Sequence, residues 1–286
     1  MRLCSCTLAL LCLAPAPLPA WGRRGHEIVA TLACRDLPPG PAAWFQGAED
    51  TLREHCNDPD IWKESDPTEG PRHFLDSEAY GGPGGVPRSR AAAEAYLGAE
   101  AFARNGQVPW VIQDQVDRLT DTFGTGDPER VWFRAAILCH YVGDLNVPLH
   151  TTANYNGQFT GQTGVHHRWE TGLVERLGDW RPEVRVAVLS AESRCAPWRW
   201  LQESFSLVGP LLRDDLEAHG PGLGGKPLED LEPERQSAYW REFGRTEGPV
   251  VREQLDRAGQ RSAEMILLAW EQAGRPLFQG RSRART

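Results

Sequence analysis

Several common patterns are scarce in this sequence. Alternating runs of β-branched residues, the mark of half-buried strands, are nearly absent. Beyond the amino-terminal segment, no apolar stretch approaches the roughly 20 residues of a membrane-spanning helix. No Cys-x-x-Cys pair occurs, so a zinc site built on thiolates is not expected. Basic residues are outnumbered by acidic ones, 31 to 39, which gives a net charge of −8. Such a chain is not steered electrostatically to polyanions, so any affinity for nucleic acid has to come from local contacts or metal ions.

Helical periodicity dominates what is present. Apolar residues recur at helical spacing in the segments 26–34, 91–104, 111–123, 129–142, 166–177, 198–208 and 250–273. Glycine and proline gather at 81–85 and 220–225, and both stretches read as loops between helices. We therefore predict an all-α fold, with a single multi-helix domain over residues 21–278.

The first 20 residues have the pattern of a secretory signal peptide. A charged start, Met1-Arg2, precedes a short apolar run and then small residues and prolines up to Ala20. Cleavage there would make Trp21 the mature amino terminus and place the protein in a secreted or periplasmic location. The basic segment 279–286 is predicted to be a disordered tail.

Four cysteines remain in the predicted mature chain, namely Cys34, Cys56, Cys139 and Cys195. An even number in an exported protein allows one or two disulfides, with a pairing that the sequence does not give.

The densest group of metal-binding residue types begins in the segment 136–150. His140 and Asp144 are four residues apart on a predicted helix, so their side chains share one face. His150 follows the expected end of that helix and can turn back toward the same place. Imidazole and carboxylate are the ligands that zinc accepts when thiolate is absent.

A second pair follows on the next predicted helix. His166 and Glu170 are again four residues apart, and His167, three residues before Glu170, is the alternative to His166. A single pair of this kind is more often a solvated surface pair. Three imidazoles and two carboxylates within about 30 residues favour convergence on metal instead.

The predicted mature terminus offers a further site. A free α-amino group has a reference pKa of about 7.7–8.0, so the amine of Trp21 could bind a metal near neutral pH together with its own carbonyl oxygen. His26 would complete that site. The alternative is an ordinary mature start with His26 near the beginning of a helix.

Other titratable residues are not predicted from their spacing to bind metal. Asp58-Pro-Asp60 on its own is a turn signal. We expect His55 and His219 at the surface rather than in a metal site.

Four motifs together resemble a known superfamily, the zinc-dependent single-strand-specific nucleases and the bacterial zinc phospholipases C. They are Trp-Gly-x-x-Gly-His from residue 21, His-Phe-x-Asp from 73, His-x-x-Gly-Asp-x-x-x-Pro-x-His from 140 and His-x-x-Trp-Glu from 166. The resemblance runs from residue 21 to about residue 177, and the carboxy-terminal third matches only in being helical. It implies a secreted all-α hydrolase in which metal-activated hydroxide attacks a phosphodiester.

The resemblance also implies three zinc ions per chain. The implied ligands are Asp60, His73, His140 and Asp144 for the first zinc, His150, His166 and Glu170 for the second, and the amine and carbonyl of Trp21 with His26 for the third, Asp144 being shared by the first and third.

Roles beyond metal binding follow from the same resemblance. Asp60 corresponds to a carboxylate that orients or deprotonates the attacking water, with Asp58 as the alternative. Lys63 matches a basic residue that contacts the phosphate, here as a point charge without bidentate geometry. Phe74 and Asp76 fall where the nucleases stack a base and hydrogen-bond its edge.

The resemblance divides over the substrate. The short gap between Trp21 and His26 is typical of the nucleases, which cleave single-stranded DNA and RNA to 5′-phosphate products. The segment 151–165 lacks their Gly-Gly-Asn loop and, like Glu170, is closer to the phospholipase version, so a phospholipase C acting on phosphatidylcholine-type lipids is the alternative. A non-catalytic zinc-binding protein is a third hypothesis. No obligate protein partner is evident.

Overall fold

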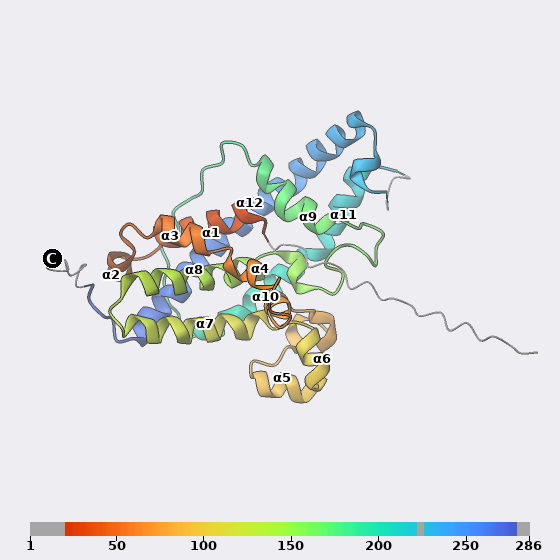
Figure 1. Cartoon of the computed structure of the whole chain (residues 1–286). Coiled ribbons are helices and arrows are strands. Elements are labelled where there is room, and N and C mark those ends of the chain that lie inside the picture. Colours follow the sequence, from red (N-terminus) through yellow and green to blue (C-terminus); the bar gives the residue numbers. More distant parts are fainter. Residues whose placement is uncertain (1–20, 222–225, 279–286) are drawn as a thin grey trace, which may run out of the picture.

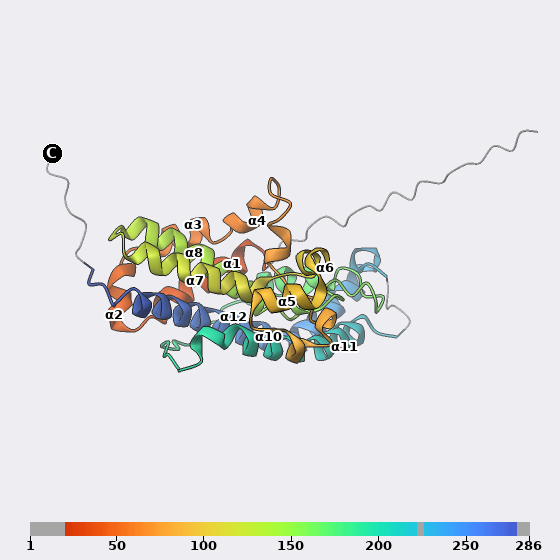
Figure 2. The same cartoon turned by 90° about the horizontal axis from the view of Figure 1, so that it is seen from below.

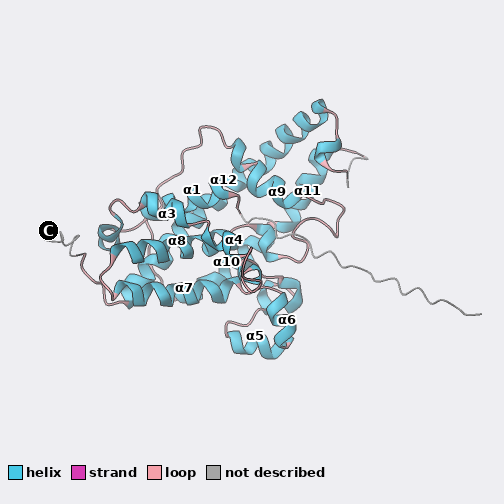
Figure 3. Cartoon of the chain, in the orientation of Figure 1, coloured by secondary structure: helices cyan, strands magenta, loops and turns pink. Residues whose placement is uncertain are grey.

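The structure is a computed structural model that describes residues 21–221 and 226–278. The expected signal peptide and basic tail lie outside the described residues. Helices connected by loops make up the described chain, and no β-strand occurs in it (Figure 3). The one pairing of extended backbone found there is an isolated bridge between Leu75 and Gly106. The predicted all-α class is confirmed.

The described residues contain twelve α-helices, labelled in Figure 1 where space allows. They are α1 (Arg23–Arg35), α2 (Pro39–Ala42), α3 (Glu49–His55), α4 (Asp58–Trp62), α5 (Arg90–Leu97), α6 (Ala99–Arg104), α7 (Val108–Phe123), α8 (Pro128–Leu145), α9 (Val165–His167), α10 (Ala196–Ser206), α11 (Val208–His219) and α12 (Pro233–Gln272). Short 3₁₀ turns cover Ala43–Phe45, Gly70–Arg72, Ser77–Tyr80, Pro83–Gly85, Pro148–Thr151, Val174–Arg176, Ser193–Cys195 and Leu228–Asp230, and a π-helical turn covers Arg168–Gly172.

Helix α8 is the centre of the fold. It begins where the Asp127 side chain accepts a hydrogen bond from the backbone N–H of Glu129 at 3.1 Å, and Pro128 occupies its first turn. Every residue from Ala135 to Leu145 is buried, so this part of the helix is covered on all sides. Helices α1, α3, α7 and α12 pack around it.

The longest helix, α12, and the peripheral helices complete the fold around α8. Helix α12 runs along its length and packs against α1, α7, α8 and α11, while α5 and α6 project from one side (Figures 1 and 2). None of the described helices has both the length and the apolar character that a membrane crossing requires.

Several local expectations differ from the structure. The segment 91–104 is two helices, because Gly98 interrupts it with a φ of 81°. The segment 166–177 is not one α-helix but α9 followed by the π-helical turn and a 3₁₀ turn. Helices α2, α3, α4 and α11 were not predicted.

The expected disulfides are not present in the structure. The four cysteines of the described chain are free thiols, with Cys56 and Cys139 buried. Burial raises the pKa of the Cys56 thiol to about 12, so this group stays protonated near neutral pH.

Candidate metal centre

Helix α8 supplies the central pair of donors. His140 and Asp144 are fully buried on one face of the helix, and the distance from His140 Nε2 to Asp144 Oδ2 is 3.3 Å. Buried carboxylates and imidazoles are costly unless they are paired or bind a metal. Two neighbouring segments meet this pair.

Asp60 and His73 complete a first group around this pair. Asp60 lies on α4, and His73 follows the 3₁₀ turn Gly70–Arg72. His73 Nδ1 is 2.9 Å from Asp144 Oδ2 and 3.0 Å from His140 Nε2. Asp60 Oδ1 is 3.7 Å from each of the same two ring nitrogens. Four donor atoms from three separate segments therefore face one point.

A second group lies beside the first. The Nε2 atoms of His150 and His166 are 3.1 Å apart, and Glu170 Oε2 is 2.9 Å from His166 Nε2 and 3.6 Å from His150 Nε2. All three side chains are buried, whereas His167 is exposed. The π-helical turn between 168 and 172 carries Glu170, so the i, i+4 pair forms without a continuous α-helix.

Backbone hydrogen bonds join the two groups. The Leu75 N–H donates to the His150 carbonyl oxygen at 2.9 Å, and His150 Nδ1 donates to the His73 carbonyl oxygen at 2.8 Å. The segment that carries His73 is thereby fixed to the 3₁₀ turn that carries His150.

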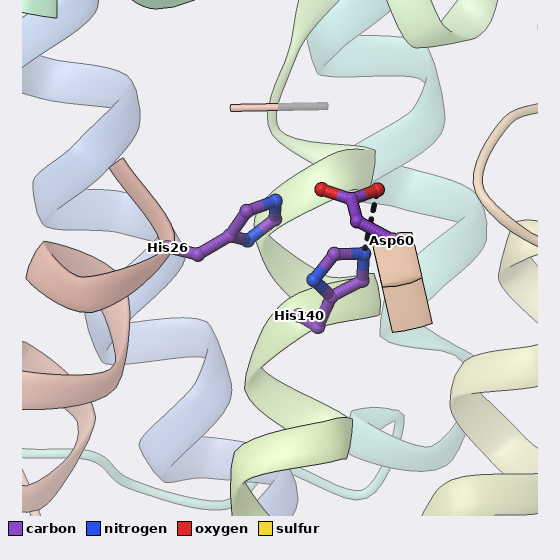
Figure 4. A group of neighbouring side chains, drawn as sticks. All are labelled: His26, Asp60 and His140. Carbon is purple, nitrogen blue, oxygen red and sulfur yellow. Dashed lines mark ion pairs between the residues drawn. The ribbon is translucent and has the colours of Figure 1, made fainter. Parts of the chain in front are cut away.

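Helix α1 carries His26, whose ring packs against that of His140. The two imidazole rings stack with centroids 3.9 Å apart, and His26 Nε2 is 3.6 Å from Asp144 Oδ1. His26, Asp60 and His140 point toward one another (Figure 4) and their donor atoms could hold one ion. Within the described chain, neither ring nitrogen of His26 has a hydrogen-bond partner.

Trp21 is packed next to His26. Its indole is fully buried, its Nε1–H donates to the Gly143 carbonyl oxygen at 2.7 Å, and its ring centroid is 5.1 Å from that of Trp169. Gly143 lies on α8 between His140 and Asp144. The first residue of the predicted mature chain is therefore held against the metal-binding helix.

Electrostatics favour a neutral His26 and ionised carboxylates at Asp60 and Asp144, whereas these two carboxylates, against the effect of burial, raise the pKa of His140. Burial, and then the neighbouring His140, lower the pKa of His26 to about 3, so its ring is neutral at neutral pH. Although burial opposes ionisation, His140 holds the pKa of the Asp144 carboxyl well below its ordinary value. Against the same effect of burial, His140 and Lys63 lower the pKa of Asp60. A neutral imidazole beside ionised carboxylates is the ligand form that binds zinc, so zinc would displace the proton that these carboxylates favour on His140.

A second observation also supports a zinc site. Several buried donor atoms have no hydrogen-bond partner in the part of the chain that the structure describes. They are both ring nitrogens of His26, Oδ1 of Asp144 and Oε1 of Glu170. Unpartnered buried polar atoms are rare in folded proteins, and coordination would satisfy these.

The expected substrate-binding residues border this centre. Lys63 Nζ is 2.6 Å from Asp60 Oδ1, with only 8% of its side chain exposed. Phe74 and Asp76 are partly exposed and directly follow His73. Burial, and then Glu78, raise the pKa of Asp76 to about 7.

Asp58 and the two remaining histidines lie elsewhere. Asp58 Oδ2 is 2.8 Å from His55 Nδ1, and both side chains are partly exposed. The expectation that His219 is a surface residue was wrong, because it is 6% exposed and its Nδ1 donates to the Asp215 carbonyl oxygen at 2.9 Å.

Sequence reasoning missed one buried acidic residue near the centre. Glu69 is 4% exposed, and its Oε1 is 3.3 Å from His73 Nε2. The available signal was its position four residues before His73.

Comparison with known proteins identifies the family. The S1/P1 nuclease family matches residues 21–270, so the chain belongs to this family. Zinc is the metal expected for this family. The alpha toxin from Clostridium absonum is a similar solved structure, with 13% identity, a TM-score of 0.45, and alignment over 88% of this chain and 63% of that one. This chain thus spans less than two thirds of that protein's length. A comparison with curated proteins gives no match.

Proposed function

We propose that this protein is a secreted or periplasmic endonuclease that cleaves single-stranded DNA and RNA to 5′-phosphate products. The observation that carries the proposal is that His73, His140 and Asp144 form one group of donor atoms, with Asp60 Oδ1 3.7 Å from the ring nitrogens of both histidines, in a member of the S1/P1 nuclease family. The second group, centred on His150, lies beside it, as hydrolysis of a phosphodiester by neighbouring metal ions requires.

The proposed centre holds three zinc ions. Its first site is formed by Asp60, His73, His140 and Asp144, its second by His150, His166 and Glu170, and its third by His26, the amine and carbonyl of Trp21, and the shared Asp144. Zinc bound there would lower the pKa of a coordinated water and neutralise charge on the phosphate.

The chain's own residues would bind and orient the substrate. Asp60 would hold the attacking water through its carboxylate, close to the Lys63 ammonium group at 2.6 Å. Lys63 would turn from Asp60 to a non-bridging phosphate oxygen, as a point charge. Phe74 offers an aromatic face for a base, and Asp76 offers hydrogen bonds to its edge.

A phospholipase C activity is the second candidate. The loop between His150 and His166 lacks the Gly-Gly-Asn sequence of the nucleases, and it carries Phe159 with 74% of its surface exposed. An exposed aromatic residue close to a phosphodiesterase centre suits contact with a lipid surface.

One experiment separates the candidates. Mature protein beginning at Trp21 is assayed in parallel on single-stranded DNA and on phosphatidylcholine vesicles, with bis-p-nitrophenyl phosphate as a substrate that both activities share. We expect EDTA-sensitive cleavage of the DNA, with 5′-phosphate ends. Cleavage of the vesicle lipid alone would replace the nuclease proposal with the phospholipase. Absence of EDTA-sensitive turnover on every substrate would leave a non-catalytic zinc protein.

A further inference from the structure

Metal-facing imidazoles in this centre are oriented in two different ways. Three of them place Nε2 toward the cluster and donate Nδ1–H to a backbone carbonyl. The acceptors are the carbonyl oxygens of Cys56 for His140 at 2.7 Å, His73 for His150 at 2.8 Å, and Tyr155 for His166 at 3.1 Å.

His73 has the reverse orientation. Its Nδ1 faces Asp144 and His140, so its Nε2 points away from the cluster. This buried Nε2 makes no hydrogen bond of good geometry within the described chain. The nearest charged group is Glu69, whose Oε1 is in ion-pair contact with it at 3.3 Å. His73 thus differs from His140, His150 and His166 in having a carboxylate behind it in place of a backbone carbonyl oxygen.

Glu69 is itself held in place. Its carboxylate accepts a hydrogen bond from the hydroxyl of Tyr141, which follows His140 on α8, and its Oε2 is 3.2 Å from Arg72 Nε. Arg72 Nε also donates to the Tyr141 hydroxyl oxygen at 3.3 Å. With 4% of its surface exposed, Glu69 is a buried anion fixed by two groups besides His73.

We propose that Glu69 is a positioning residue for the first zinc site, acting through His73. This inference rests on the ligand assignment of the proposed function. Glu69 itself would not touch the metal. The Glu69 carboxylate, 3.3 Å from His73 Nε2, stabilises the tautomer with its proton on Nε2, which keeps the Nδ1 lone pair directed toward Asp144 and His140. A carboxylate behind a ligating imidazole fixes its tautomer and makes it a stronger donor.

Removing the charge of Glu69 while keeping its size distinguishes a positioning role from a packing role. Glu69→Gln keeps the size of the side chain and an oxygen acceptor, but it removes the negative charge that supports His73. Loss of an outer partner of this kind commonly weakens metal affinity by roughly 10- to 100-fold. Tyr141→Phe retains the charge and removes only one of the bonds that hold Glu69, so we expect a smaller loss.

The test measures zinc affinity in full-length mature protein by competition with a chromophoric chelator. Glu69→Gln is compared with wild type, with Tyr141→Phe, and with Asp256→Asn, another change of a buried carboxylate to an amide, located on α12 and 3.8 Å from Arg185. We expect one zinc of Glu69→Gln to bind ten- to 100-fold more weakly, while Asp256→Asn binds zinc as wild type does.

A double-mutant comparison decides whether the effect passes through His73. The His73→Ala variant loses the proposed route, so adding Glu69→Gln to it should leave the affinity of the remaining zinc ions unchanged. A further loss in that background, or a wild-type affinity in Glu69→Gln alone, would overturn the proposal. Urea unfolding in EDTA checks the fold, and an affinity loss explained by unfolding of the metal-free variant would also overturn it. Nuclease activity plays no part in the readout, so wild-type protein that binds zinc without cleaving DNA would refute only the proposed function.

Discussion

The carboxyl group of Glu247 provides a quantitative test of the structure. Glu247 lies on α12, is 2% exposed, and accepts a hydrogen bond from Trp169 Nε1 at 2.7 Å. The same tryptophan packs against Trp21 beside the proposed metal centre. Burial raises the pKa of Glu247 from 4.5 to about 7, although the Trp169 bond lowers it, and nearby Asp214 adds to the increase.

The sign of the pH effect follows from this direction. Folding favours the neutral carboxyl, so its contribution is most favourable below the unfolded pKa of 4.5 and is lost as pH rises toward the folded pKa of about 7. Between about pH 5 and about pH 8, the loss amounts to about 2.5 kcal/mol of unfolding free energy. Glu247→Gln cannot ionise, and its amide oxygen still accepts from Trp169, so this variant should lack that loss.

Urea unfolding followed by circular dichroism measures this difference. The experiment is done in EDTA, since zinc binding has a pH dependence of its own. We expect the free energy of unfolding of Glu247→Gln, relative to wild type, to increase by about 2.5 kcal/mol from about pH 5 to about pH 8. Glu217→Gln, a change of an exposed glutamate on α11, is the control and should follow wild type. Parallel curves for wild type and Glu247→Gln would refute the reasoning.

Three further predictions concern the proposed centre. A protein that keeps one extra residue before Trp21 should bind one zinc fewer per chain by metal analysis, because an amide nitrogen replaces the amine; an unchanged zinc content would show that the amine is not a ligand. His166→Ala should lose one zinc and most phosphodiesterase activity, whereas His167→Ala, a change of the exposed neighbour, should retain both, and equal effects would contradict the assignment. Phe74→Ala should weaken binding of single-stranded DNA by about 1–3 kcal/mol through lost base stacking, while leaving hydrolysis of bis-p-nitrophenyl phosphate intact; an equal loss on both would indicate a general defect.

Much of the fold was predictable because helical periodicity is strong in the long segments. The segment 129–142 was predicted on its apolar pattern, and the structure extends it to Pro128–Leu145. Short helices were missed for a physical reason: α4 has only five residues and begins with Asp58-Pro59, a sequence that equally suits a turn. Its place is set by packing against α8, which sequence spacing does not reveal.

Within the candidate site, local pairs were easier to predict than long-range ones. The spacing of His140 and Asp144 alone places both on one face of a helix. The approach of Asp60 and His73 depends on tertiary packing, and it was anticipated only through the family resemblance. The role of Glu69 could not be predicted from the sequence, because it depends on which ring nitrogen of His73 faces the metal, and either nitrogen can do so.

Gly143 shows that a sequence motif can record helix packing as well as chemistry. A Cβ atom at this position would lie 3.2 Å from His26 Nδ1 and 3.5 Å from Trp21 Cδ1. The missing side chain lets α1 approach α8 closely enough for Trp21 to pack against the metal-binding helix. Gly143 therefore marks the close approach of α1 to α8. A sequence motif that requires this glycine selects for that close approach. In Gly143→Ala, the His26 ring would have to shift by a few tenths of an ångström, without the loss of any donor atom, whereas the contact with Trp21 would stay an ordinary one.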